Sequence, residues 1–209
     1  MRVIGGVDRG RTLAAPRGRG TRPTADRVRE ALFDILGPRI IGTRVLDLFA
    51  GTGAVGIEAL SRGAAYAVFV ESDREALRAL RRNLATLGLP GTRAQIVAGD
   101  ARDALAAIAC SEPAFDLVFL DPPYAGSLVP PVLAALAASP LVRPGADVVV
   151  QHRVKTPVPT VPGLSPAREP RRYGETALTF LLAEGYTRAG SSSELHTPGV
   201  RRTSTAPRA

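Results

Sequence analysis

The sequence is poor in the residues that build disulfides, metal centres and membrane spans. Cys110 is the only cysteine, so no internal disulfide can form, and no Cys/His cluster has metal-ligand spacing. A lone cysteine is typical of a reducing compartment. No uninterrupted apolar run reaches the length of about 18 residues that a membrane helix needs, and residues 1–6 do not resemble a signal peptide. We therefore expect a soluble, cytoplasmic protein without a metal site.

Aromatic residues and lysine are also scarce. Aromatics make up 5% of the 209 residues and tryptophan is absent, whereas hydrophobic residues make up 45%, so an aliphatic core of one domain is expected. Lys155 is the only lysine, and arginine supplies almost all of the positive charge behind a net charge of +8. Such a composition bias could by itself place arginine anywhere in the chain.

The excess positive charge lies at the two ends of the chain. Residues 1–30 contain eight arginines and three acidic residues, and residues 187–209 contain four arginines and one glutamate, whereas residues 31–186 are balanced. Composition bias does not explain a neutral middle. Segregated positive charge favours a polyanionic partner, because neutralised phosphates release counterions. The candidate nucleic-acid contacts are Arg9, Arg11, Arg17, Arg19, Arg22, Arg27 and Arg29.

From residue 44 onward, apolar strands alternate with helices. Runs such as Leu117–Leu120 are apolar on both faces, which is typical of strands buried between two helical layers in a doubly wound parallel sheet. A turn at 171–176 predicts an antiparallel hairpin at the end of the sheet. The expected strands are 44–49, 66–71, 94–98, 115–120, 147–151 and 177–182, and the expected helices are 54–62, 74–87, 101–109 and 128–138.

The two ends differ in composition from this α/β body. Residues 1–22 predict a basic extension that contains a small β-hairpin around Asp8–Gly10. A helix opened by Thr24 and stopped at Gly37 begins the main domain, which we expect to span residues 23–184. Residues 185–209 have little apolar content, which predicts a disordered tail.

A glycine-rich turn follows the first strand of the α/β body. Gly51, Gly53 and Gly56 match the pattern G-x-G-x-x-G between a strand and a helix, and Glu71 ends the next strand. Glycine lets the backbone approach a ligand closely, and the carboxylate can accept hydrogen bonds from ribose hydroxyls. The motif therefore predicts a nucleoside-type cofactor.

Acidic residues at three successive strand ends bear on which cofactor it is. Asp47 would oppose a pyrophosphate, but it suits the ammonium and sulfonium groups of S-adenosylmethionine. Asp100 can accept the adenine amino group, and the backbone N–H of Ala101 can serve a ring nitrogen. We therefore expect S-adenosylmethionine in preference to a nicotinamide dinucleotide. The same site is expected to include Phe49, Ala50 and Ser72.

The fourth expected strand runs directly into Asp121-Pro122-Pro123-Tyr124. Ligands of open α/β sheets bind beyond the carboxyl ends of the strands, and two prolines remove two N–H donors. What remains is a rigid loop of acceptors, which can hold both hydrogens of a planar amino group. Asp121 can offset the charge that develops on the nitrogen and take its proton, and Tyr124 can stack on a base. The loop predicts methyl transfer to an aromatic or amide nitrogen.

With these motifs in place, the chain resembles bacterial 16S ribosomal RNA guanine-N2 methyltransferases of the RsmD type over residues 1–184. The segment that begins Thr-Arg-Pro-Thr is the most specific part of the likeness, because the glycine and Asp-Pro-Pro-Tyr motifs occur in many amino-methyltransferases. The segments that carry the resemblance are 21–24, 26–33, 47–53, 60–64, 121–124 and 172–178.

The resemblance implies a seven-stranded class I methyltransferase fold with an N-terminal hairpin. It also implies S-adenosylmethionine as methyl donor and the exocyclic amine of one guanine in 16S rRNA as acceptor, within an assembled or assembling 30S subunit. We expect the enzyme to be a monomer. The fifth strand ends in Gln151-His152, where an acid is common in the family, so no function is carried over to these two residues.

Other functions remain open at this point. The same chemistry could act on a DNA adenine or a protein glutamine, although the basic N-terminus argues against a protein and the small size argues against sequence-specific DNA modification. The glycine motif alone would also suit a nicotinamide-dependent dehydrogenase. An RNA-binding module without catalysis is the fourth possibility.

Overall fold

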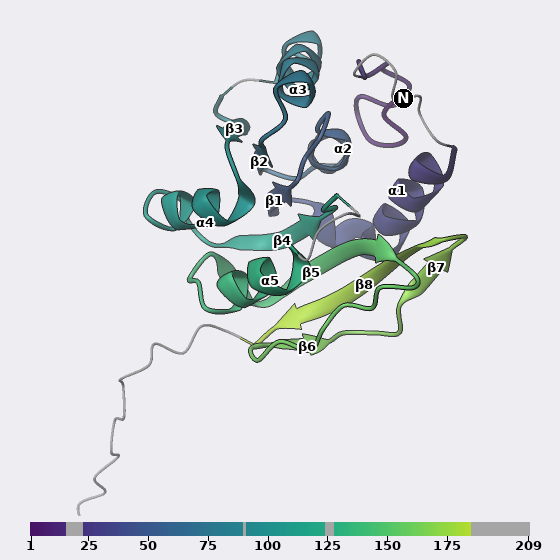
Figure 1. The fold of residues 1–209 in the computed structure, drawn as a ribbon. Coiled ribbons are helices and arrows are strands. Elements are labelled where there is room, and N and C mark those ends of the chain that lie inside the picture. The colour runs from purple at the N-terminus through teal and green to yellow at the C-terminus, as the bar shows by residue number, and fades with distance from the viewer. Residues whose placement is uncertain (16–22, 90, 124–127, 185–209) are drawn as a thin grey trace, which may run out of the picture.

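The computed structural model describes residues 1–15, 23–89, 91–123 and 128–184. These residues form one mixed sheet of eight strands with helices on both faces (Figure 1). The expected tail at 185–209 lies outside the described residues, as do Arg17, Arg19, Arg22 and Tyr124. No helix in the described part of the chain is long and apolar enough to cross a membrane.

The sheet is parallel over its first five strands and antiparallel at its end. The order is β3-β2-β1-β4-β5-β8-β6, with β7 also paired to β8, and β8 runs antiparallel to β5. This arrangement confirms the doubly wound α/β class and the antiparallel end. The strands are β1 (Arg44–Leu48), β2 (Tyr66–Glu71), β3 (Ala94–Ala98), β4 (Phe115–Leu120), β5 (Val142–Arg153), β6 (Leu164–Pro166), β7 (Arg171–Tyr173) and β8 (Thr176–Ala183).

The number of strands is eight, where the family resemblance implied seven. The extra strand, β6, lies in a proline-rich stretch that the sequence assigns to a connection. It pairs with β8 through Leu164↔Ala183 and Pro166↔Leu181. β6 lies at the end of the strand order, where a proline is tolerated because its missing N–H has no partner strand to serve.

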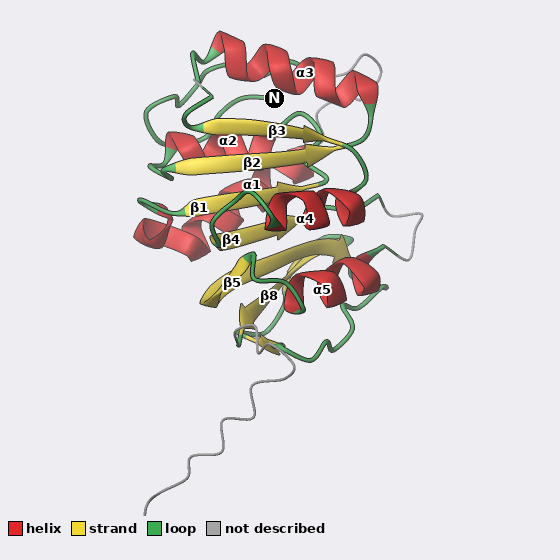
Figure 2. Ribbon diagram, turned by 90° about the vertical axis from the view of Figure 1, so that its left-hand side faces the viewer, coloured by secondary structure: helices red, strands yellow, loops and turns green. Residues whose placement is uncertain are grey.

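Helices cover the two faces of the sheet separately. The side chains of α1, α2 and α3 pack with Phe69, Phe119 and Phe180, whereas those of α4 and α5 pack with Val118, Val148 and alternate neighbours of the same strands. Figure 2 shows α4 and α5 in front of the strands. The helices are α1 (Pro23–Leu36), α2 (Ala54–Ser61), α3 (Arg74–Thr86), α4 (Ala101–Ala109) and α5 (Val129–Ala137), and a 3-10 turn (Gly37–Ile40) follows α1.

The N-terminal hairpin is present as a short paired turn. Backbone hydrogen bonds join Val3 N–H to the Arg11 carbonyl at 3.0 Å and Leu13 N–H to the Met1 carbonyl at 2.9 Å. The side chains of Val3 and Leu13 are 1% and 3% exposed and belong to the core beneath α1, α2 and α3. The described N-terminal residues are therefore packed into the main body of the protein.

Candidate active site

The carboxyl ends of the parallel strands meet at one edge of the sheet, where the arrowheads in Figure 2 point. A cavity of about 210 Å³ opens there. Its wall combines Asp47 and the loop after β1 with Asp121 after β4 and Gln151 of β5. Met1 and Arg29 of the N-terminal region complete it. The topology thus brings two loops to a single cavity. One is the loop around Gly51, predicted to bind the methyl donor and called the donor loop; the other begins at Asp121, is predicted to hold the acceptor amine and is called the acceptor loop.

Asp47 is the most deeply buried acid of this cavity, with 2% of its surface exposed. Its Oδ2 accepts a hydrogen bond from Gly56 N–H at 2.9 Å, at the start of α2. Burial raises the pKa of Asp47 to about 7; the Gly56 bond lowers it, and the charges of Asp121 and Glu71 raise it further. A cation bound next to Asp47 would favour the ionised carboxylate and relieve this cost.

Asp121 lies directly after β4, and burial raises its pKa to about 7 as well. A hydrogen bond from Gln151 acts in the opposite direction. Pro122 is buried and Pro123 is exposed, so the loop leaves the cavity towards the surface at this point. Of the four predicted acceptor-loop residues, Tyr124 lies outside the described residues.

Gln151 is a cavity residue to which the sequence assigned no role. In the parallel register of β4 and β5, Leu120 is opposite Val150, so the next residues along, Asp121 and Gln151, are neighbours. Aligning the carboxyl ends of the two adjacent parallel strands would have identified this pair from the sequence. The following residue, His152, is buried with Nε2 at 2.8 Å from Thr179 Oγ1 and Nδ1 at 2.9 Å from the Arg153 carbonyl, so both ring nitrogens have protein partners.

The three motif glycines have different structural roles. Gly51 has a φ of +58°, and a Cβ built on it would have no atom within 4 Å, so the backbone leaves room beside the cavity. Gly53 has a φ of +80°, and a Cβ there would lie 2.4 Å from Leu80. Gly56 is helical, but a Cβ on it would lie 2.3 Å from the Phe69 ring, so it permits close helix–sheet packing. Of the three glycines, Gly51 is the one that lines the cavity.

Phe49 provides a second sign that the donor loop is specialised. Its φ is +63°, and it is the only non-glycine residue with positive φ in the described part of the chain. A left-handed conformation of this kind costs on the order of 1–3 kcal/mol and tends to occur at functional sites. Both Phe49 and its neighbour Ala50, which are expected from the sequence at the cofactor site, line the cavity.

Glu71 and Asp100 lie at the next two strand ends. Glu71 accepts three backbone hydrogen bonds, from Gly51 at 2.7 Å, Ser72 at 2.8 Å and Asp73 at 2.7 Å. An ionised carboxylate has about four acceptor positions, so one remains for a ligand. Asp100 caps α4 by accepting from Arg102 N–H at 2.9 Å. Ala101 begins this helix, and its N–H has no partner within the helix.

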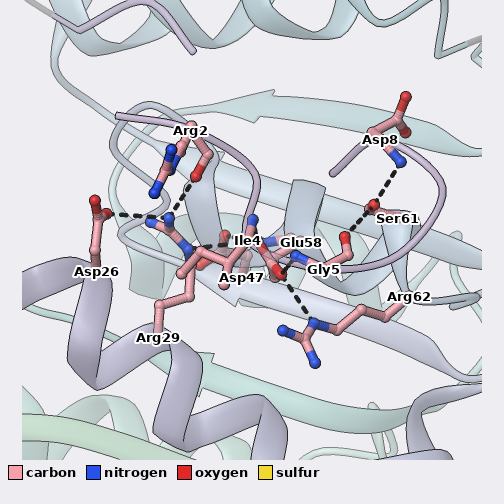
Figure 3. Close-up of polar contacts among 11 residues, drawn as sticks. Arg2, Ile4, Gly5, Asp8, Asp26, Arg29, Asp47, Glu58, Ser61 and Arg62 are labelled. Carbon is pink, nitrogen blue, oxygen red and sulfur yellow. Dashed lines mark hydrogen bonds and ion pairs between the residues drawn. The ribbon is translucent and has the colours of Figure 1, made fainter. Parts of the chain in front are cut away.

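The predicted nucleic-acid arginines in the described residues differ in their exposure and in their partners. Arg29 is 4% exposed, which removes it from the candidate surface: its Nη2 donates to the Arg2 carbonyl at 2.7 Å and to Asp26 at 3.1 Å (Figure 3). Arg11 is exposed, but its Nη2 donates to the Thr86 carbonyl at 2.8 Å. Arg9 and Arg27 are exposed beside a hollow of about 290 Å³.

Glu58 explains why Arg29 is buried. This carboxylate, 1% exposed, lies 3.6 Å from Arg29 Nε and 2.8 Å from Arg62 Nε. It also accepts from Ile4 N–H at 2.8 Å and Gly5 N–H at 2.7 Å, so it fastens the N-terminal segment to α2 (Figure 3). A single acid within the otherwise apolar stretch of residues 54–60 was the available sequence signal for such a buried partner.

No group of three metal-ligating side chains occurs among the described residues.

A family model described as "Conserved hypothetical protein 95" matches residues 1–182. Ribosomal RNA small subunit methyltransferase D of Escherichia coli K12 is 41% identical over 166 residues, which cover 78% of this chain and 79% of that protein.

Solved structures agree with this relationship. An E. coli structure with a provisional methyltransferase name has 38% identity and a TM-score of 0.76, and the match covers 88% of this chain and 98% of that one. A Streptococcus mutans structure provisionally named a SAM-dependent methyltransferase has a TM-score of 0.61 at 14% identity, covering 78% of this chain and 50% of that one. The second likeness is one of fold, and it supports a class I methyltransferase fold.

Proposed function

The chain belongs to the RsmD-type family whose model it matches, and on that premise we propose that it methylates the exocyclic N2 amine of a guanine in 16S rRNA. We propose that the substrate is presented within an assembled or assembling small subunit and that the enzyme acts as a monomer. The E. coli relative is named for methylation of small-subunit rRNA. The observation that carries the proposal is that Asp47, Asp121 and Gln151 line one cavity. Two prolines follow Asp121 in the sequence.

The residues at the strand ends fit S-adenosylmethionine as methyl donor. Two carboxyl groups whose pKa values are raised to about 7 share the cavity, and a cationic ligand stabilises their ionised forms. Asp47 and the loop around Gly51 would hold the methionine part. Glu71 would accept from the ribose, and Asp100 with the Ala101 N–H would face the adenine. When bound, this cofactor supplies a methyl group on a positively charged sulfur.

Asp121 would act on the acceptor amine. Its carboxylate, with the backbone carbonyls near Pro122 and Pro123, would accept hydrogen bonds from both amine hydrogens and so orient the nitrogen lone pair. An exocyclic amine is a poor nucleophile, so orientation and charge stabilisation must supply much of the rate. A carboxylate with a pKa near 7 is also well placed to take the proton that the methylated nitrogen loses.

Gln151 would position Asp121 for this task. Its side-chain hydrogen bond favours the ionised carboxylate, which burial alone would disfavour. A neutral amide does so without adding a second negative charge beside Asp121. A carboxylate at position 151 would instead repel Asp121, and one of the two would hold a proton.

Methyl transfer from radiolabelled S-adenosylmethionine to rRNA tests the proposal. Naked 16S rRNA, precursor particles and mature 30S subunits from a strain that lacks the modification serve as substrates, and Asp121→Asn serves as the inactive control. We expect label in one guanine N2 of 16S rRNA with the native protein only. Label in adenine, in DNA or in protein would overturn the substrate assignment. Binding of NADH without binding of S-adenosylmethionine would overturn the reaction class.

A further inference from the structure

A second cavity in the described part of the chain lies outside the methyl-transfer site. It has a volume of about 500 Å³ and lies between the connection 154–170 and strands β5 and β8, and we call it the strap groove. Its floor includes His152, Thr179 and Leu181, and its rim includes Arg168 and Arg172. A cavity of this size is in the range that holds small ligands, so the groove has room for about one nucleotide.

The strap groove lies next to a small cavity beside the acceptor loop. A small cavity of about 40 Å³ is lined by Pro122 and Pro123 of that loop, by Gln151 and by His152. His152 also lines the strap groove, so the two cavities share this residue. An RNA strand in the strap groove would therefore lie near the loop proposed to hold the target base.

Positive charge gathers around the strap groove. Residues 153–175 contain five basic and two acidic residues, within a middle region that is neutral as a whole. Lys155, Arg168, Arg171 and Arg172 are all exposed, and in the described structure no ion pair joins any of them to a carboxylate. Charges that are not paired with a carboxylate are available for phosphates.

The groove is held in shape by the sheet and by proline. Ala167 N–H donates to the Phe180 carbonyl at 2.9 Å, and Val154 N–H donates to the Glu175 carbonyl at 2.9 Å, so the connection is fastened to β8 and to the turn before it. The Arg168 guanidinium lies 4.9 Å from the centroid of the Phe180 ring, whose side chain is on the face of β8 opposite to Thr179 and Leu181, so this arginine is at the edge of the groove. Prolines 157, 159, 166 and 170 line the wall and restrict its backbone.

We propose that the strap groove binds the RNA strand that flanks the methylated guanine, with Arg168 and Arg172 contacting its phosphates. This inference rests on the proposed function. Enzymes that modify a base inside a folded nucleic acid take that base out of its stack and hold the neighbouring nucleotides in place. The apolar proline wall offers a surface for a sugar or a base, and the arginines at the rim contact the backbone. An RNA strand fits both the positive charge of the groove and its position near the acceptor loop.

The double variant Arg168→Ala/Arg172→Ala tests the groove. Its affinity for 16S rRNA should fall about tenfold near physiological salt, and the slope of log K against log salt should become shallower by about 1.4, the value for two lost contacts to a single strand. Affinity for S-adenosylmethionine and the transfer rate at saturating RNA should stay unchanged. Arg81→Ala/Arg82→Ala removes the same charge from the exposed face of α3 and serves as the matched control.

Several outcomes separate this inference from the proposed function. If the native protein methylates rRNA but the groove variant binds RNA as tightly as the native protein, or loses no more affinity than the α3 variant, the groove assignment is wrong and the function stands. A loss of affinity for 30S particles but not for naked rRNA would identify a ribosomal protein as the partner and overturn the RNA assignment. If the native protein neither binds nor methylates rRNA, both proposals fail.

Discussion

Replacing Asp47 by asparagine should stabilise the ligand-free protein, and by an amount that grows with pH. The pKa of Asp47 rises from 3.8 to about 7, so the folded protein holds this proton more tightly than the unfolded chain does. Each pKa unit corresponds to about 1.4 kcal/mol, so the ionised side chain lowers the free energy of unfolding by about 4 kcal/mol above pH 7. Asparagine can keep the Gly56 hydrogen bond through its own carbonyl oxygen without this cost.

The sign of the effect follows from the raised pKa. The stabilising contribution of Asp47 is fully present below its unfolded pKa and is lost as the pH rises towards about 7. Between pH 5 and pH 8, the advantage of Asp47→Asn over the native protein should therefore grow by about 3 kcal/mol. The same variant should bind S-adenosylmethionine more weakly, because it lacks the charge that the cofactor would meet.

Urea unfolding at pH 5 and pH 8 measures this difference directly. Asp34→Asn, on an exposed position of α1, makes the same chemical change in water and controls for the loss of one charge. A stability difference between Asp47→Asn and the native protein that stays constant across this pH range would refute the reasoning. In that case the carboxyl group would not be held neutral by burial, and the argument for a cation beside it would lose its physical basis.

Four further predictions follow from the site and its supports. Cofactor affinity, measured by calorimetry, should rise from pH 6 to pH 8 by up to about tenfold per unit as Asp47 ionises, and the product, whose thioether sulfur carries no charge, should show a weaker trend. Asp121→Asn should reduce transfer by on the order of a hundredfold or more, with cofactor affinity within a few-fold. Gln151→Glu should shift the pH–rate profile to higher pH, whereas Gln151→Asn should not. Deleting residues 1–15 should lower the melting temperature, because it exposes core and leaves Glu58 without two donors; unchanged melting would contradict the packing described above.

Much of the fold could be predicted because its strands are apolar runs with clear boundaries. β2, β3, β4 and α4 have the predicted bounds, and α1 ends at Leu36 before Gly37-Pro38 as expected. β5 begins at Val142 instead of 147, because pairing with β4 resumes across a register shift and overrides the local Pro-Gly signal. β6 depends on its partner β8, which no local pattern of residues 164–166 reveals.

The site was predictable where chemistry follows a strand end and not where it depends on a distant partner. Asp47, Gly51 and Asp121 could be selected as candidates because they lie at or just after strand ends, and all three line one cavity. Arg29 looked like a solvated arginine, since its partner Glu58 lies on another helix. Gln151 was given no function because the family resemblance leads one to expect an acid there, and an amide beside a buried acid has no motif of its own.

The attachment of the N-terminal segment has a consequence for how this surface can change in evolution. Glu58 and Ser61 hold the segment through the backbone amides of Ile4, Gly5 and Asp8, and the Ser61 carbonyl accepts from Val7 N–H at 2.8 Å. Backbone amides are the same for every residue except proline. Exposed side chains of this segment can therefore change, or be selected for a different substrate, while Glu58 and Ser61 of α2 stay constant. The fold separates the part that must be inherited unchanged from the part that is free to diversify.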